Sequence, residues 1–168
     1  MSDELWMHAA TQEARKCLET PHSALRTPHS QDVPIGAICV FQNEIIGRGW
    51  NQREARNDPT AHAEVLALRE AAARLGDWRL NDVTLYVTLE PCPMCAGALW
   101  LARISRLVFG AWDEKAGACG SLLDLPRDPR FNHRLQVKGG ILESECALLL
   151  SDFFQSKRGV QPAHKTSV

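Results

Sequence analysis

Residues 83–103 read VTLYVTLEPCPMCAGALWLAR, a predicted β-strand that leads into a predicted helix beginning with two cysteines. We expect the strand over 83–89 and the helix over 92–103, where a proline is tolerated because the first helical turn has no use for its missing N–H. Cys92 and Cys95 then lie one turn apart on one face of the helix. Four interpretations of a single Cys-x-x-Cys pair compete. They are a disulfide, a thioredoxin-like redox couple, half of a structural zinc site, and part of an open metal site that needs a ligand from elsewhere.

The composition is that of an ordinary globular protein. With 168 residues, 45% of them hydrophobic and 23% charged, the chain can bury about two-thirds of its unfolded surface in one domain without disulfides. No signal peptide or membrane-spanning run is evident, so we expect a cytoplasmic protein with no membrane partner. In that reducing compartment the six cysteines should be free thiols or metal ligands, which weakens the disulfide interpretation. The formal net charge of −1 argues against a protein that coats nucleic acid indiscriminately.

The segments on either side of residues 83–103 predict an α/β fold with three layers. In chain order they are a helix over 3–19, a β-hairpin over 33–41 and 45–51, a helix over 60–75, strands over 105–111 and 135–139, and a helix over 143–157. Asp58 as N-cap, followed by a proline, marks the start of the second helix. The order of elements indicates a mixed sheet of about five strands with helices on both faces. We expect a single domain over 1–168, with a loop at 20–32 and a flexible tail at 159–168.

A second short motif, DPTAHAE at residues 58–64, supplies what the cysteine pair lacks. His62 lies near the start of one predicted helix and Cys92 and Cys95 at the start of the next, and helix N-termini gather near the carboxyl ends of parallel strands. Three N and S ligands form an incomplete tetrahedron, as in catalytic zinc sites that keep the fourth position for water. Zinc lowers the pKa of such a water from about 16 to about 7. Glu64 lies where it can act as a general acid and base without ligating the metal.

Two other interpretations of these residues fit less well. A zinc metalloprotease needs His-Glu-x-x-His, and no histidine follows His62 until His133. A thioredoxin-like couple is disfavoured because prolines flank Cys92 and because the His-x-Glu motif would be unexplained. Taken jointly, His-x-Glu, a helix, a strand and Pro-Cys-x-x-Cys form a specific order.

That order resembles the zinc-dependent cytidine/deoxycytidylate deaminase superfamily, whose known signature is H-x-E…P-C-x-x-C. Within it, the chain is most similar to the bacterial tRNA-specific adenosine deaminases. The resemblance covers residues 33–158 and is carried by VPIGAICV, GRGWN, DPTAHAE, LYVTLEPCPMCAGAL, RLVFGAWD, AGACGSLLD, NHR, GGIL and SDFF. It implies a cytidine deaminase-like fold, one zinc ion per subunit held by His62, Cys92 and Cys95, and Glu64 as the proton shuttle. It also implies a homodimer that converts the wobble adenosine, position 34, of the tRNA-Arg anticodon stem-loop to inosine.

The resemblance further implies a set of substrate contacts. Asn51 matches an asparagine that hydrogen-bonds the purine edge, although capping a turn would also explain it. Asp113 matches a position near the substrate nucleotide and its ribose, where a solvated loop acid is the alternative. A loop that the family lays along RNA corresponds to Asn132, His133 and Arg134, and a surface or locally bonded histidine is the alternative for the second of these.

The last predicted helix offers four more candidates for RNA contacts, namely Phe153, Phe154, Lys157 and Arg158. The phenylalanines are either core residues or stacking platforms for bases, since adjacent side chains on a helix face different directions. The two basic residues would bind phosphates.

Some features fall outside the resemblance, and two rival functions stay open. Trp112 stands where the bacterial tRNA enzymes often carry arginine, and four cysteines match no ligand position and should be buried thiols: Cys17, Cys39, Cys119 and Cys146. One rival is a deaminase of a free base or nucleoside, guanine or cytosine/cytidine, with the same zinc chemistry. The other is a non-catalytic zinc-stabilised RNA-binding module, which is disfavoured because it would not require Glu64.

Overall fold

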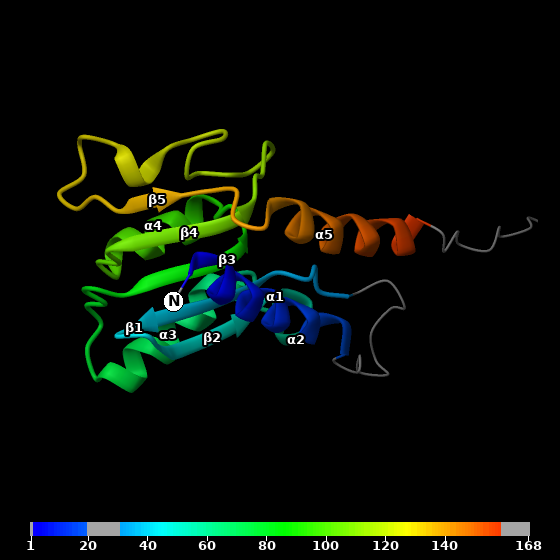
Figure 1. Cartoon of the computed structure of the whole chain (residues 1–168), viewed down its shortest axis with the longest axis horizontal. Helices are drawn as coiled ribbons and strands as arrows, with labels where there is room; N and C mark the ends of the chain where they lie inside the picture. Colours follow the sequence, from blue (N-terminus) through cyan, green and yellow to red (C-terminus); the bar gives the residue numbers. More distant parts are fainter. Residues whose placement is uncertain (1, 20–30, 159–168) are drawn as a thin grey trace, which may run out of the picture.

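A five-stranded mixed sheet lies between two layers of helices in the computed structural model, which describes residues 2–19 and 31–158 (Figure 1). The elements are α1 (Asp3–Glu19), β1 (Gly36–Phe41), β2 (Glu44–Trp50), α2 (Arg53–Arg56), α3 (Ala63–Leu75), β3 (Thr84–Leu89), α4 (Pro93–Leu101), β4 (Arg106–Ala111), the 3-10 helix η1 (Leu125–Arg127), β5 (Gln136–Lys138) and α5 (Glu143–Arg158). The predicted fold class is confirmed. The predicted tail at 159–168 and most of the predicted loop at 20–32 lie outside the described residues.

The sheet, in the order β2-β1-β3-β4-β5, has an antiparallel half and a parallel half. β1 runs antiparallel to β2 and β3, whereas β3, β4 and β5 are parallel. The hairpin between β1 and β2 turns at Gln42 and Asn43, which both have positive φ, as tight hairpin turns of this kind require. Because β3 and β4 are parallel, their carboxyl ends at Leu89 and Ala111 lie side by side. This edge of the sheet is where an α/β fold places a ligand site.

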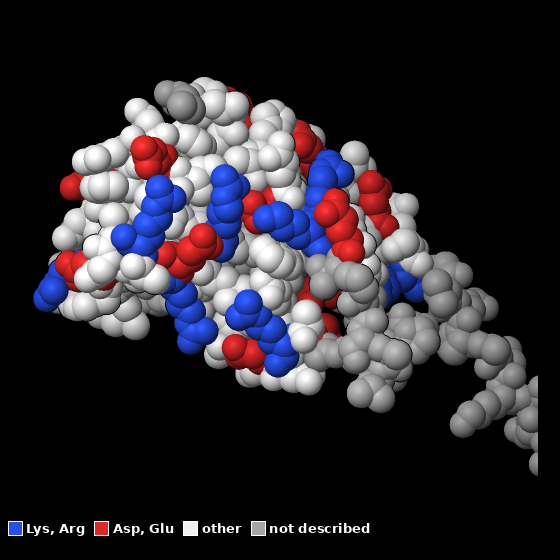
Figure 2. All heavy atoms as spheres, turned by 90° about the horizontal axis from the view of Figure 1, so that it is seen from below, with Lys and Arg blue, Asp and Glu red and all other residues white. Residues whose placement is uncertain are grey.

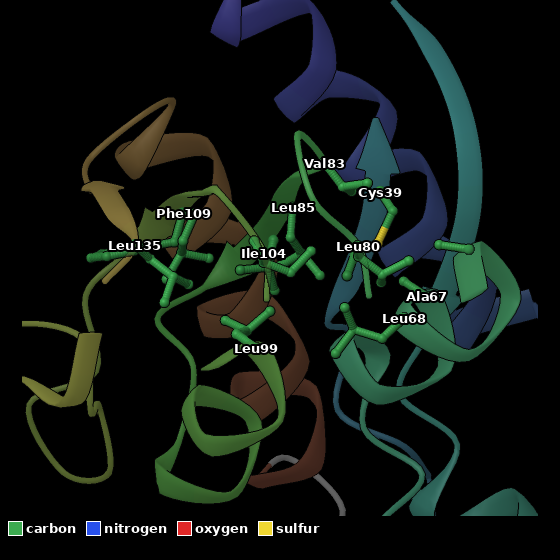
Figure 3. Packing of buried hydrophobic residues seen from close by; sticks show 14 of the residues in the cluster. Cys39, Ala67, Leu68, Leu80, Val83, Leu85, Leu99, Ile104, Phe109 and Leu135 are labelled. Carbon is green, nitrogen blue, oxygen red and sulfur yellow. The ribbon is translucent and has the colours of Figure 1, made fainter. Parts of the chain in front are cut away.

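Each face of the sheet has its own hydrophobic core. The core under α3 and α4 is drawn in Figure 3 and includes Cys39, Ala67, Leu68, Leu85, Leu99 and Phe109. The core on the other face packs α1 and α5 against the sheet and includes Trp6, Met7, Ala10, Ile38, Val108 and Cys146. Burial of these side chains removes apolar surface from water and so fixes the helices that carry the site residues.

Two glycines of β2 let α3 approach the sheet closely. A Cβ atom on Gly49 would overlap the backbone carbonyl of Ala63, and one on Gly47 would overlap the carbonyl of Ala67. Any larger residue at these two positions would push α3 away from β2. The glycines therefore set the position of the first turn of α3, which carries His62 and Glu64.

Helix α3 begins three residues later than the sequence predicts. Asp58 does accept hydrogen bonds from the backbone N–H and the hydroxyl of Thr60, at 2.8 and 2.7 Å, but these bonds stabilise a separate turn. The N-cap of α3 is His62, in an extended conformation. Helix α4 likewise begins at Pro93 with Cys92 as its N-cap, and ends at Leu101. Residues from both motifs thus occupy N-cap positions. Among the described residues, no helix combines the length and the apolar character that crossing a membrane would need.

Candidate active site

The three predicted metal ligands come together between the N-termini of α3 and α4. Among the described residues, His62, Cys92 and Cys95 form a group whose ligand atoms all lie within 4.8 Å of one another. The Nδ1 atom of His62 is 3.7 Å from the Sγ atom of Cys92 and 3.4 Å from that of Cys95. Cys95 is fully buried, while the other two residues are half-buried at the edge of a cavity.

These distances fit a tetrahedral zinc ion. Zinc–sulfur bonds of about 2.3 Å and zinc–nitrogen bonds of about 2.1 Å, at a tetrahedral angle, would separate sulfur from nitrogen by about 3.6 Å. The two observed separations, 3.7 and 3.4 Å, lie on either side of that value. Three soft or borderline donors also match the preference of zinc better than that of magnesium or calcium. The group is therefore a candidate metal site with one open coordination position.

Hydrogen bonding within this group favours the thiolate that metal binding requires. Hydrogen bonds from Cys95 and His62 lower the pKa of Cys92 to about 4. The same bond to Cys92, together with burial, raises the pKa of Cys95, and the bond to Cys92 also raises the pKa of His62. These shifts favour a thiolate at Cys92 and protonated forms of Cys95 and His62. A divalent cation that bound all three side chains would displace the protons of the last two.

Glu64 lies in the first turn of α3 beside the ligands and is only 4% exposed. Burial raises the pKa of its carboxyl group above the usual range. A carboxyl group with a raised pKa can both accept and return a proton near neutral pH, as a general acid and base must. Glu64 lines the same cavity as His62 and Cys92, so this proton would be exchanged at the site itself.

The catalytic cavity, as we call this space, has a volume of about 250 Å³. Its lining residues are Val33, Ile35, Asn51, Arg53, His62, Ala63, Glu64, Leu89, Glu90, Cys92, Asp113 and Ala116. Asn51 is 6% exposed, and its side-chain N–H donates to the carbonyl of Val33 at 3.2 Å, whereas its Oδ1 atom has no hydrogen-bond partner. A buried acceptor without a partner is costly, so this oxygen is suited to accept an N–H from a ligand in the cavity.

A second cavity, of about 590 Å³, adjoins the catalytic cavity. Val33, Leu89 and Asp113 line both spaces, and the second cavity also receives side chains from the loop after β4 and from α5. Trp112 and Phe154 are the large aromatic residues in its lining, and both are exposed. The structure therefore brings Asn51 and Asp113 to the metal site, and Phe154 to the adjoining cavity.

The other candidates on α5 differ in exposure. Phe153 is 6% exposed and packs against the protein, whereas Phe154 is 46% exposed. Phe153 thus has little surface to offer a base. The ammonium group of Lys157 lies 5.5 Å from the centre of the Phe153 ring, and the guanidinium Nε of Arg158 donates to the carbonyl of Phe154 at 3.4 Å.

The predicted RNA loop at residues 132–134 lies at the other end of the sheet. The Nε2 atom of His133 is 2.7 Å from the carbonyl oxygen of Ile104, just before β4, whereas the metal site lies beyond the carboxyl end of β4. Asn132 accepts a hydrogen bond from Arg103 at 2.8 Å, and Arg134 is exposed. Within one chain these residues are therefore not brought to the catalytic cavity.

Two charged lining residues were not singled out from the sequence. Arg53 brings a cation from α2, and Glu90 brings a buried carboxylate from the end of β3. Glu90 stands two residues before Cys92, which is a local signal. Its partners lie 23 to 31 residues further along the chain, in a loop without periodic pattern, and no sequence rule reveals them.

Comparisons with known proteins identify relatives of this chain in sequence and in fold. A family model described as MafB19-like deaminase matches residues 7–158. The tRNA-specific adenosine deaminase of Bacillus subtilis (strain 168) is 46% identical over 166 residues, which are 99% of this chain and 97% of that protein. A structure from a study of A-to-I editing by tRNA:A34 deaminases at the wobble position has 42% identity and a TM-score of 0.77, over 87% of this chain and 99% of that chain. A guanine deaminase from Nitrosomonas europaea, at 24% identity and a TM-score of 0.71 over 90% of this chain and 84% of that one, shares the fold.

The similarity extends beyond the segments singled out in the sequence. The family model includes α1 as well as the residues from 33 onward, and the Bacillus protein matches almost the whole chain. The His-x-Glu and Pro-Cys-x-x-Cys motifs lie in that matched region, where the structure joins them in one site. From its sequence, its fold and its site, the chain belongs to the tRNA-specific adenosine deaminases, within the MafB19-like deaminase family.

Proposed function

We propose that this protein is a zinc enzyme that hydrolyses adenosine to inosine at the wobble position of the tRNA-Arg anticodon. The observation that carries the proposal is one arrangement: the His62, Cys92 and Cys95 triangle opens into a cavity that is also lined by the buried carboxyl group of Glu64. A ligand set, a proton carrier and a space for a base are thereby combined. The names of the relatives support the substrate class.

The reaction replaces the exocyclic amino group of adenine with oxygen from water and releases ammonia. Zinc held by His62, Cys92 and Cys95 would activate the attacking water at neutral pH. Water supplies two protons: Glu64 passes one to N1 of the purine and the other to the departing amino group, which leaves as ammonia. The free Oδ1 of Asn51 can accept from the 6-amino group, which carries the only N–H bonds of adenine in a nucleotide, and so orients the purine before the amino group leaves. Both protons of the water are thus recovered, one on the ring nitrogen of inosine and one in ammonia.

The size of the catalytic cavity suits a single base. Its volume of about 250 Å³ is below the range of about 300–1,000 Å³ that is typical of sites for drug-sized ligands. A nucleotide must therefore leave its stack to enter, and an anticodon loop presents bases that are already splayed out. The exposed ring of Phe154 in the adjoining cavity is available to stack on a neighbouring base. We propose phosphate contacts for Lys157 and Arg158, at the end of α5.

The β2 edge of the sheet offers RNA less. At the β2 edge, Arg74 pairs with Glu44 at 3.2 Å and Arg48 with Glu13 at 2.9 Å. Figure 2, which views the molecule from below, shows basic and acidic side chains interspersed on this face. Charges of both signs largely cancel in their attraction for phosphates, so we place RNA on the side of the catalytic cavity.

We further propose a homodimer that packs through a groove between α3 and α4. The groove is lined by apolar side chains and one arginine, namely Val65, Leu68, Arg69, Ala72, Trp78, Leu80, Ala98, Leu101 and Ala102. Trp78 and Leu101 are largely exposed in the single chain, which favours a covering partner. Residues 132–134 lie near the end of α4, because Asn132 bonds to Arg103. In a dimer these residues would contact RNA held by the other subunit, which explains why they lie far from the site in their own chain.

The remaining parts of the proposal concern the chain as a whole. We propose that residues 1–168 form a single deaminase domain and that the protein works in the cytoplasm, where its tRNA substrate is used. None of the six cysteines forms a disulfide, in keeping with that compartment.

The experiment that tests the function is incubation of the zinc-loaded protein with an unmodified tRNA-Arg anticodon hairpin that carries A at the wobble position. We expect inosine at that position by nucleoside mass analysis, and no reaction with a hairpin that carries G there. Free guanine, cytidine and adenosine are assayed alongside. Conversion of free guanine or cytidine, with the RNA adenosine intact, would favour a free-base or nucleoside deaminase. Zinc and RNA binding with no deamination of any substrate would favour an RNA-binding module.

The dimer has its own test. Leu101→Glu places a charge in the groove and should convert the dimer to a monomer in sedimentation experiments. Leu148→Glu, at an exposed leucine of α5 that does not line the groove, is the matched control and should stay dimeric. A wild-type protein that is monomeric while active would contradict the proposed assembly.

A further inference from the structure

The carboxylate of Glu90 is the centre of a hydrogen-bonded cluster beside the metal ligands. Glu90 is 2% exposed, at the end of β3. Its Oε1 atom accepts the backbone N–H groups of Cys119 at 2.9 Å and Ser121 at 3.0 Å. Its Oε2 atom accepts the backbone N–H of Asp113 at 3.1 Å and the hydroxyl of Ser121. All four donors belong to one segment, residues 112–121, which we call the wall loop.

Residues of the wall loop line both cavities. Asp113 and Ala116 line the catalytic cavity, and residues 112–115 line the adjoining cavity. The loop has little regular structure of its own, so its shape depends on what it is bonded to. Other hydrogen bonds also hold the loop. The N–H of Ala118 donates to the carbonyl of Pro91 at 2.8 Å, the Asp113 carboxylate accepts N–H groups within the loop, and further backbone bonds join the loop to residues 122–125.

The space around the Glu90 carboxylate is filled on the loop side. A Cβ atom on Gly117 would overlap the carboxylate of Glu90, so the loop closes on Glu90 at a residue without a side chain. A carboxylate has about four acceptor sites, and four donors from the loop occupy them. Glu90 is therefore not free to exchange a proton with water or substrate, in contrast to Glu64.

We propose that Glu90 is a positioning residue for the reaction: it holds the wall loop in register with the metal helix α4, and so fixes the surface that receives the substrate nucleotide. The role rests on the deaminase function proposed above. The role follows from the position of Glu90 in the chain, because Glu90 is followed directly by Pro91 and then by the ligand Cys92. Glu90 thus connects the wall loop, on the substrate side of the cavity, to the metal side. Loss of its hydrogen bonds should raise KM more than it lowers kcat, since the ligands and Glu64 belong to other elements.

The variant Glu90→Gln tests this role with almost no change in volume. One oxygen can still accept two N–H groups, but the new NH₂ group faces the backbone N–H of Asp113, which leaves two donors opposed. For the hairpin substrate we expect KM to rise about tenfold while kcat stays within about threefold, because an interaction that orders the binding surface is lost. Zinc content should stay at the wild-type level. Hydrogen exchange should become faster at the amides of Asp113, Cys119 and Ser121.

Two further variants keep the test valid if Glu90→Gln folds poorly. Ser121→Ala is the milder one: it removes only the hydroxyl donor and should raise KM by about threefold. Gly117→Ala places a methyl group against the Glu90 carboxylate from the loop side and should give the same pattern of raised KM and retained zinc. The matched control is Glu70→Gln: Glu70 also accepts a backbone N–H, from Arg48 at 3.0 Å, but it is exposed and lines neither cavity.

The outcomes separate this inference from the proposed function. Unchanged KM and unchanged loop exchange in Glu90→Gln, with an active wild type, would overturn the positioning role and leave the function standing. Loss of zinc would also overturn it, because Glu90 would then act on the metal ligands. If the wild-type protein does not deaminate the hairpin, the function fails, and hydrogen exchange alone decides whether Glu90 orders the loop.

Discussion

The two sides of the catalytic cavity are built differently and serve different purposes. The metal side consists of helix N-termini held by a packed core, with His62 and Cys92 at N-cap positions. The wall side consists of an irregular loop, held in part by the buried carboxylate of Glu90, and of exposed residues of α5. Chemistry needs atoms fixed within fractions of an ångström, whereas a nucleic acid must enter and leave. The contrast indicates that changes on the metal side act on kcat, and changes on the wall side act on KM.

Glu64 on the metal side and Glu90 on the wall side differ in the same way. Burial raises the pKa of Glu64 and outweighs the stabilisation of its charge by a backbone N–H, His62 and Cys95. Burial also acts to raise the pKa of Glu90, but hydrogen bonds from Ser121, Asp113 and Cys119 outweigh it and the pKa is lowered. A carboxyl group of the first kind can carry protons at neutral pH, and one of the second kind is a permanent anion that organises the loop.

The largest effect is expected from removal of a proposed metal ligand. Cys92→Ser replaces a sulfur of low pKa with a hydroxyl group that binds zinc weakly, so both bound zinc and deaminase activity should be lost. Elemental analysis of the purified variant measures the metal. Cys146→Ser, at a buried cysteine that belongs to the other core, is the control and should keep its zinc. Full zinc occupancy in Cys92→Ser would mean that the ligand set is wrong.

Replacement of Glu64, the proposed proton carrier, should be nearly as severe for activity but not for metal binding. Glu64→Gln keeps the shape of the side chain and cannot exchange protons, so kcat should fall by about 10²–10⁴-fold, the usual contribution of general acid–base catalysis. Zinc content should not change. The thermal midpoint should not fall either, since the variant removes a buried group whose ionisation is disfavoured. A variant with wild-type kcat would remove Glu64 from its role.

The metal side was largely predictable from the sequence, and the wall side was not. His62, Glu64, Cys92 and Cys95 lie in two short motifs at helix starts, and local rules place helix starts together at one edge of an α/β sheet. The start of α3 itself was misplaced by three residues, because Asp58 caps a separate turn rather than the helix. Local sequence signals show which side chains belong to the site. The residue at which the helix begins depends on which of two neighbouring N-cap candidates starts it.

The wall side depends on contacts between distant parts of the chain. The bonds of Glu90 to the wall loop follow from tertiary packing, and nothing in a single sequence reports them. Similarly, the segment at residues 132–134 could be matched to a family motif, but only the pairing of β5 with β4 reveals which end of the sheet it occupies. Exposure separates Phe153 from Phe154 for the same reason, since both suit an amphipathic helix equally well in the sequence.

The dependence of stability on pH should show that Glu90, on the wall side, is ionised in the folded protein. The pKa of Glu90 is lowered on folding from its ordinary value of 4.5, so its contribution is fully present above pH 4.5 and is lost as pH falls through the lower folded value. The free energy of unfolding of wild type should exceed that of Glu90→Gln by a constant amount between about pH 5 and 7. The difference should shrink below that window. Urea titrations at each pH measure this difference in the free energy of unfolding. Glu70→Gln serves as the reference, because loss of metal in acid affects all variants alike. A difference that grows in acid would contradict the lowered pKa.

A smaller effect on activity is expected at the far rim of the wall side. Phe154→Ala removes an exposed ring from the adjoining cavity and should raise KM for the hairpin by about fivefold, since stacking on a base is worth about 1–3 kcal/mol and an exposed ring should contribute at the lower end of that range, while kcat and stability stay near wild type. Phe153→Ala is the matched control: its ring is buried, so its loss should lower the free energy of unfolding by about 3 kcal/mol and leave KM nearly unchanged. If the two variants exchange these effects, the substrate approaches from the other face of α5, and the wall side as defined here does not bind RNA.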